Sequence, residues 1–97
     1  MSVDKEVELA GIRKRVKELL VSNLAFLDEL DPAKIKDDEI LFGEGLGLDS
    51  LDAVEIVVLL QRHFNLEVKD MKVGREIFKS IDTLSRYIYE NAPKDKR

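Results

Sequence analysis

The sequence contains no cysteine among its 97 residues. The chain therefore cannot form a disulfide or offer a thiolate to a metal, and any thiol chemistry needs a thiol brought in from outside. No apolar run approaches the ~20 residues that a membrane-spanning helix needs. The first residues, Met1 to Glu6, are charged and lack the apolar stretch of a secretory signal. These absences predict a cytoplasmic protein without a membrane segment.

Residue patterns that support catalysis are also missing. His63 is the only histidine, and it follows Ser50 by thirteen residues on the same predicted helix, too far along that helix to act as the base of this serine. Ser50 lacks the flanking glycines of a nucleophile elbow. The glycines at positions 43, 45 and 47 match neither a Walker loop nor a dinucleotide fingerprint. We therefore expect no catalytic residue and no enzyme activity.

Basic residues are absent from one stretch of the chain, positions 37 to 61. Seven of the 20 acidic residues lie there: Asp37, Asp38, Glu39, Glu44, Asp49, Asp52 and Glu55. A block of one sign favours association with a basic partner and disfavours nucleic acid, whose phosphates it would repel. A solvated acidic face without a partner is the alternative. The acids do not follow the alternation of an EF-hand loop, so no metal site is predicted.

Hydrophobic spacing predicts three helices, over residues 4–22, 50–64 and 81–91. The long connection between the first two contains Asp31-Pro32, typical of a short helical turn, and the three glycines, which require irregular backbone. No pair of strands is indicated. The fold class is therefore all-α, a small bundle forming one domain over residues 1–97, with its core in 4–91 and a frayed tail at 92–97.

The predicted helix at 50–64 is more apolar than a surface helix requires. Its apolar residues exceed a single stripe, so the helix is either central to the core or leaves apolar surface exposed for docking. Asp49 or Ser50 can cap its start, and a serine in this position is most often only a cap.

The run from Phe42 to Glu55, FGEGLGLDSLDAVE, resembles the acyl carrier protein family, specifically its stand-alone members. The resemblance rests on Asp-Ser-Leu at a helix start, the spacing from Phe42 to Ser50, and the Leu-Asp-x-Val-Glu that follows. It extends to the Asp31-Pro32 turn and to the Ser80-Ile81 opening of the last helix.

The resemblance implies a bundle of three major helices with a short extra helix at 75–79. It implies that a phosphopantetheinyl transferase moves 4′-phosphopantetheine from coenzyme A to Ser50. Acyl groups then travel as thioesters on the thiol of this arm, which explains thiol chemistry in a chain without cysteine. The carrier delivers them to enzymes of fatty-acid, polyketide or specialised lipid biosynthesis, and we expect a monomer.

By the same resemblance, two sets of residues have assigned roles. Enzymes with basic patches would dock on Asp49, Leu51, Asp52, Val54, Glu55 and Val58. The acyl chain would lie in a cleft formed by Phe42, Val57, Leu60, Val68 and Ile77.

Three features differ from the usual family pattern. Gln61 and Arg62 stand where many fatty-acid carriers have acids near the end of the second helix. The stretch between Phe64 and Ser80 is longer than usual and carries Lys69, Lys72, Arg75 and Lys79, and Phe78 adds a large aromatic near the expected cleft. They predict a cargo or enzyme set other than that of bulk fatty-acid synthesis. The alternatives are an aminoacyl or peptidyl carrier, and a helical interaction subunit that carries nothing.

Overall fold

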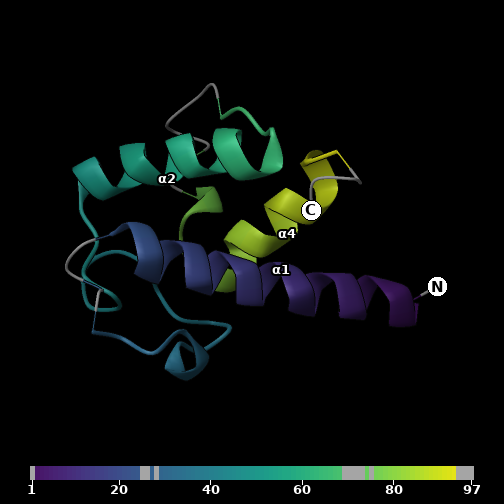
Figure 1. Ribbon diagram of the computed structural model, residues 1–97, viewed down its shortest axis with the longest axis horizontal. Coiled ribbons are helices and arrows are strands. Elements are labelled where there is room, and N and C mark those ends of the chain that lie inside the picture. Colours follow the sequence, from purple (N-terminus) through teal and green to yellow (C-terminus); the bar gives the residue numbers. More distant parts are fainter. Residues whose placement is uncertain (1, 25–26, 28, 69–73, 75, 94–97) are drawn as a thin grey trace.

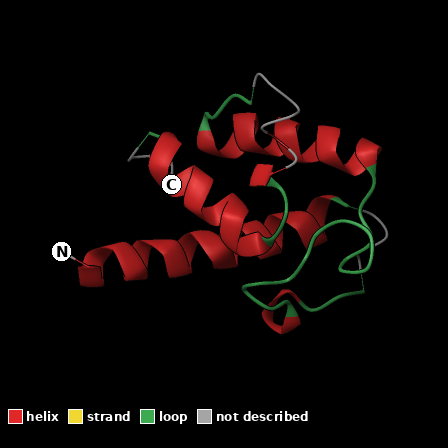
Figure 2. Ribbon diagram, turned by 180° about the vertical axis from the view of Figure 1, so that it is seen from behind, coloured by secondary structure: helices red, strands yellow, loops and turns green. Residues whose placement is uncertain are grey.

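The computed structural model describes residues 2–24, 27, 29–68, 74 and 76–93, with the side chains of residues 2–4 left out. Its helices are α1 (Ser2–Asn23), the 3-10 turn η2 (Pro32–Lys34), α2 (Ser50–Phe64) and α4 (Ile81–Asn91). Figure 1 shows α1 and α2 running in opposite directions, with α4 packed against α1. Figure 2 colours the described elements as helix or loop throughout. The predicted all-α bundle is confirmed.

Side chains at the helix starts explain where these helices begin. Asp31 accepts a hydrogen bond from Ala33 N at 3.0 Å ahead of Pro32, so η2 begins where the Asp-Pro pair predicts. Ser80 accepts from Thr83 N, and Thr83 Oγ1 accepts in return from Ser80 N at 2.9 Å, which is a capping box for α4. Both predicted starts are confirmed.

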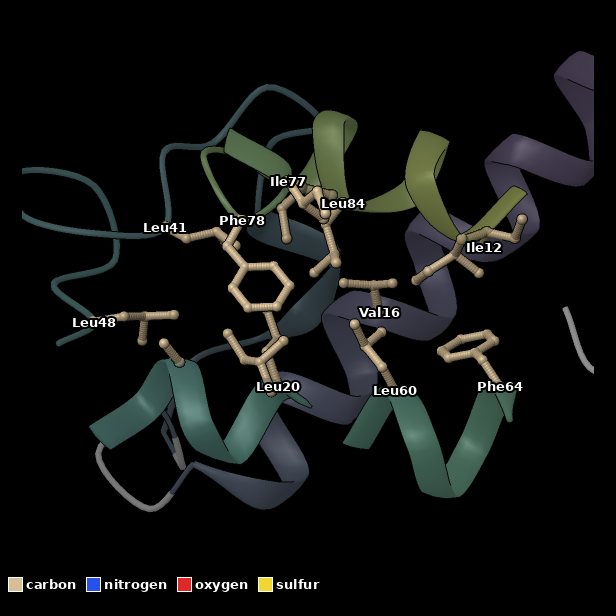
Figure 3. Close-up of a cluster of buried hydrophobic side chains, with 14 of the residues drawn as sticks. Ile12, Val16, Leu20, Leu41, Leu48, Leu60, Phe64, Ile77, Phe78 and Leu84 are labelled. Carbon is tan, nitrogen blue, oxygen red and sulfur yellow. The ribbon is translucent and has the colours of Figure 1, made fainter. Parts of the chain in front are cut away.

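The core is one cluster of buried side chains contributed by all three major helices and by the loops between them. Figure 3 shows Val16 and Leu20 of α1 facing Leu60 of α2, with Leu84 of α4 above them. These four side chains are at most 3 % exposed. At ~25 cal/mol per Å² of apolar surface removed from water, such burial is the main stabilising term of a helical bundle.

α1 is also tied to the other two helices by arginines. Arg13 donates to Asp82 at 3.0 Å, which joins α1 to α4. Arg15 donates to the carbonyl of His63 at 3.2 Å, and its guanidinium lies 4.5 Å from the centre of the Phe64 ring. This carbonyl belongs to the last turn of α2, where cations are favoured by the helix dipole.

The short extra helix expected at 75–79 corresponds to helical backbone at Gly74, Glu76 and Ile77. Phe78 N donates to Gly74 O at 2.8 Å, the spacing of an α-helical turn. Arg75 lies outside the described residues. The turn places Ile77 and Phe78 in the core, at 8 % and 1 % exposure.

Two loop segments far apart in sequence are joined by backbone hydrogen bonds. Leu41 N donates to Lys79 O and Ile81 N donates to Glu39 O, both at 3.1 Å, around an isolated bridge between Ile40 and Ser80. These bonds fix the loop that precedes α2 against the start of α4.

α4 ends at Asn91, as predicted, but the core includes one residue beyond the predicted limit at 91. Ala92, assigned above to the tail, is 5 % exposed, and its N–H donates to Ile88 O at 2.9 Å. Residues 94–97 of the predicted tail lie outside the described residues.

Candidate functional site

Ser50 is the first residue of α2, and Asp49 is its cap. The Asp49 carboxylate accepts from Leu51 N at 3.0 Å and from Asp52 N at 3.2 Å, while Asp52 Oδ2 accepts from Asp49 N at 2.9 Å. Within the described residues, no hydrogen bond holds the exposed Ser50 hydroxyl. Of the two caps that the sequence left open, the structure selects Asp49, so this serine is free of a capping role.

The loop before α2 depends on three glycines for its backbone conformation and close packing. Gly43 and Gly47 have φ of 65° and 78°, a region that other residues rarely adopt. Gly45 lies so close to Ile40 that an added Cβ would meet the carbonyl oxygen of Ile40 at 1.6 Å. Leu46 N donates to Ile40 O at 2.9 Å, and Leu48 N donates to Leu41 O at 3.0 Å. The predicted irregular backbone at the three glycines is confirmed, and it holds the start of α2 in place.

A cavity of about 530 Å³ opens beside Ser50. Its lining is largely apolar: Ile40, Phe42, Ala53 and Phe78, with Asp49, Ser50 and Lys79 as the polar members. Figure 3 shows the Phe78 ring pointing from its turn toward α2, near Leu41 and Leu48. The cavity can therefore take an apolar chain that starts at the serine.

The five residues assigned to an acyl cleft fall in different places. Phe42 lines the cavity beside Ser50. Leu60 and Ile77 are core residues at 2 % and 8 % exposure, and Val57 and Val68 are partly buried against the core. Sequence reasoning assigned no cleft role to Ile40, Ala53 or Lys79, because their place on the cavity depends on the contact between residues 39–41 and 79–81, which leaves no periodic signal.

α2 is both central to the core and exposed, so the structure combines the two alternatives that its apolar excess left open. Ala53, Ile56, Leu59, Leu60 and Phe64 are buried. On the other side, Leu51 is 79 % exposed, Val54 56 % and Val58 38 %. Asp49 and Glu55 are exposed near these three side chains along the helix, and Asp52 is half-buried. Three large apolar side chains in water next to carboxylates are typical of a docking surface.

One acid of the base-free stretch is paired within the chain. Lys17 of α1 donates to Asp37 Oδ1 at 2.6 Å. This hydrogen bond is the main reason that the pKa of the Asp37 carboxyl lies below its ordinary value. The ammonium of Lys17 therefore offsets the charge of Asp37. Asp37 is not part of α2, so this pair does not neutralise the acids of that helix.

Of the four bases that differ from the family pattern, only Lys79 can be placed. Lys69, Lys72 and Arg75 lie outside the described residues. In the part of the chain that the structure describes, no group of three or more metal-ligating side chains is assembled, and no helix is long and apolar enough to cross a membrane.

A free serine hydroxyl at a helix start, an apolar cavity beside it and an exposed acidic and apolar face define a carrier rather than a catalyst. Comparison with known proteins agrees with this class. Residues 14–88 match the family model described as the phosphopantetheine attachment site. The acyl carrier protein of Wolinella succinogenes is 37% identical over 76 residues, covering 78% of this chain and 91% of the relative. That of Bdellovibrio bacteriovorus is 35% identical over 78 residues, covering 80% and 91%.

The chain therefore belongs to the acyl carrier protein family. It is an acyl carrier and not an enzyme, and its cofactor is 4′-phosphopantetheine. The residues present fit this group, because an accessible hydroxyl adjoins a cavity of about 530 Å³ whose lining is largely apolar. When bound, the group supplies the thiol that the cysteine-free chain lacks.

Proposed function

We propose that Ser50 is the residue to which the phosphopantetheine arm is attached, and that acyl groups on this arm are delivered to enzymes of fatty-acid or related lipid biosynthesis. The observation that carries the proposal is the Ser50 hydroxyl itself. It is exposed at the first position of α2, it borders the apolar cavity, and capping is done by its neighbour Asp49. A transferase can therefore modify this serine without removing a hydrogen bond that the helix needs.

The test is intact mass spectrometry after incubation with coenzyme A and a phosphopantetheinyl transferase. We expect wild type to gain the mass of one phosphopantetheine group and Ser50→Ala to gain none. Because Asp49 is the cap, the free energy of unfolding of Ser50→Ala should lie within ~0.5 kcal/mol of that of wild type, which is the usual range for surface substitutions. A mass gain in Ser50→Ala, or none in wild type, contradicts the proposal, and the unfolding measurement excludes misfolding as the cause.

The proposed docking surface consists of Asp49, Leu51, Asp52, Val54, Glu55 and Val58, and its proposed partners are the transferase and synthesis enzymes with basic patches. The high exposure of Leu51 and Val54 supports this, because burial of apolar surface against a partner supplies affinity, while the nearby carboxylates supply steering.

The proposed cargo space is the cavity beside Ser50 together with the cleft residues predicted from the sequence, Phe42, Val57, Leu60, Val68 and Ile77. Phe42 borders the cavity, and the other four lie in or against the core. An acyl chain longer than the cavity would have to displace these core side chains, so the space supports chains of limited length. We propose an acyl rather than an aminoacyl cargo, because the lining is largely apolar.

We further propose that residues 1–97 form one carrier domain that acts as a monomer in the cytoplasm. The single core cluster, which runs from Ile12 to Ala92, supports one domain. Light scattering of the purified protein tests the monomer, and a mass of twice the chain would contradict it.

A further inference from the structure

The start of α2 offers little hydrogen-bond or cationic support to the phosphodiester of an arm on Ser50. A helix N-terminus normally offers free backbone amides to a phosphate. In α2, the amides of Leu51 and Asp52 donate to Asp49 Oδ1 at 3.0 and 3.2 Å, and the amide of Asp49 donates to Asp52 at 2.9 Å. Ala53 N already donates to Asp49 O at 3.0 Å. These amides therefore have partners before any phosphate arrives.

The charges around Ser50 are also unfavourable to an anion. The carboxylates of Asp49 and Asp52 form the capping box on either side of it, and Glu55 is exposed a little more than one turn along the helix. A phosphodiester bonded to Ser50 Oγ is negative at all physiological pH values, so each of these acids repels it.

Lys79 is the cation among the described residues that line the cavity beside Ser50. Its backbone is fixed there, because Lys79 O accepts from Leu41 N at 3.1 Å and the bridge between Ile40 and Ser80 lies next to it. Its side chain is exposed, and within the described part of the chain no ion pair or hydrogen bond engages its ammonium. A lysine that lines an apolar cavity and has no carboxylate partner among the described residues is available to a ligand.

We propose that Lys79 binds the phosphodiester of the arm on Ser50 and thereby directs the arm into the cavity lined by Ile40, Phe42 and Phe78. The inference rests on the proposed attachment at Ser50. With the phosphodiester held between Ser50 and Lys79, the rest of the arm starts at the cavity mouth, on the side away from the exposed face of α2. Lys79 is thus a positioning residue for the arm and takes no part in the attachment chemistry.

The experiment compares the phosphopantetheine-bearing forms of wild type, Lys79→Gln and Lys79→Arg. Lys34→Gln is the matched control, because Lys34 is an exposed lysine in η2 that does not line this cavity. A transferase of broad specificity installs the arm, and intact mass confirms that each sample is fully modified. Absence of the mass gain in wild type would contradict attachment at Ser50, whereas the readouts below concern Lys79 alone.

The first readout is the ³¹P chemical shift of the phosphodiester at low and high salt. We expect a salt-dependent shift in wild type, Lys79→Arg and Lys34→Gln, and little salt dependence in Lys79→Gln, because salt screens an exposed ion pair. The second readout is the rate at which the arm's thiol reacts with 4,4′-dithiodipyridine, an uncharged reagent. We expect this rate to rise about 1.5- to 5-fold in Lys79→Gln, because loss of the ion pair leaves the arm outside the cavity more often. This factor corresponds to the free energy of an exposed ion pair.

Equal ³¹P behaviour and equal thiol rates in Lys79→Gln and wild type would overturn the proposal. The proposal would also be overturned if Lys34→Gln changed both readouts as much as Lys79→Gln does. The effect would then depend on the total charge of the protein and not on Lys79. Restoration of both readouts in Lys79→Arg supports it, because arginine keeps the charge at the same position.

Discussion

At the scale of single residues, the proposed attachment at Ser50 depends on Asp49, and not Ser50, being the cap of α2. Serine and aspartate are both good helix caps, so their order alone does not reveal which one caps α2. The structure gives both capping hydrogen bonds to Asp49, with Asp52 completing the box. Ser50 is left at the first helical position, where its hydroxyl faces solvent and the cavity.

Gly45 is the residue whose substitution should most disturb this arrangement. A Cβ there would lie 1.6 Å from Ile40 O and 2.4 Å from Ile40 C, so the backbone of residues 40–45 would have to move. We expect Gly45→Ala to lower the free energy of unfolding by about 1–3 kcal/mol, the range for overpacked sites. Because the same loop positions Ser50, we also expect slower modification by the transferase. Urea unfolding and timed mass spectrometry measure the two effects.

Gly11 offers a matched control for this glycine substitution. It lies within α1, is exposed, and has nothing within 4 Å of an added Cβ. Gly11→Ala should raise the free energy of unfolding by about 0.5–1 kcal/mol, since alanine favours the helix interior. Equal stability of the Gly45→Ala and wild-type proteins would contradict the close packing of Gly45 on Ile40.

At the scale of elements, the helices could be predicted because their signals are local. Apolar spacing and cap residues predict the bounds of α2 and α4 at both ends, and the ends of α1 to within two residues. Asp31-Pro32 and Ser80 each mark a start through a contact within three residues. Burial within α2 was only partly predictable. The helix has apolar residues on more than one side, and their spacing does not tell which of these sides faces the core.

The cavity could not be predicted in the same way, because it is made by segments about 40 residues apart. Ile40 and Lys79 come together through a few backbone hydrogen bonds between irregular segments, which have no hydrophobic period. The family resemblance supplied Phe42 but gave no role at the cavity to Lys79 or Ala53. Phe78 was expected near the cleft but outside its assigned lining, and the structure places it in the lining of the cavity.

The ion pair between Lys17 and Asp37 joins α1 to the long connection and should make stability depend on pH. The pKa of Asp37 is lowered in the folded protein from its ordinary value of 3.8, mainly by the hydrogen bond from Lys17. The unfolded chain therefore holds this proton more tightly, so the stabilisation is present above pH 3.8 and is lost as the pH falls through the lower folded-state pKa. We expect Asp37→Asn to cost about 0.2–1 kcal/mol at neutral pH, as exposed pairs do.

Urea unfolding of wild type and Asp37→Asn across acid and neutral pH measures this difference. It should shrink toward zero at the acid end. Asp38→Asn is the control, because Asp38 is the exposed neighbour and the described structure gives it no ion pair. A difference between wild type and Asp37→Asn that stays constant down to the acid limit would show that the pair with Lys17 is not its source.

At the scale of the whole molecule, α2 has a side that packs in the core and an exposed side for which we propose a docking function. One side packs in the core and, through Ala53, borders the cavity beside Ser50. The other side exposes Leu51, Val54 and Val58 among carboxylates. In the proposed docking, a partner enzyme on the exposed side would reach Ser50 at the start of the same helix without contacting the buried side.

Charge reversal on the exposed side of α2 tests whether this surface binds partners. Glu55 is exposed and adjoins Val54, so Glu55→Lys places a cation where the proposed basic patch of a partner would dock. We expect the transferase to modify Glu55→Lys with kcat/KM reduced roughly 3- to 30-fold at low salt, because opposed charges slow encounter. The reduction should become smaller as salt rises, since screening weakens long-range repulsion.

Glu90→Lys makes the same change of charge on α4, where Glu90 is exposed and away from the proposed docking residues. Both variants alter the net charge of −4 by the same amount, so total charge affects them equally. A loss confined to Glu55→Lys assigns the effect to the α2 surface, whereas equal losses would mean that partners respond only to overall charge. Because the proposed attachment requires the transferase to reach Ser50 at the start of this helix, a normal rate in Glu55→Lys would remove Glu55 from the proposed docking surface.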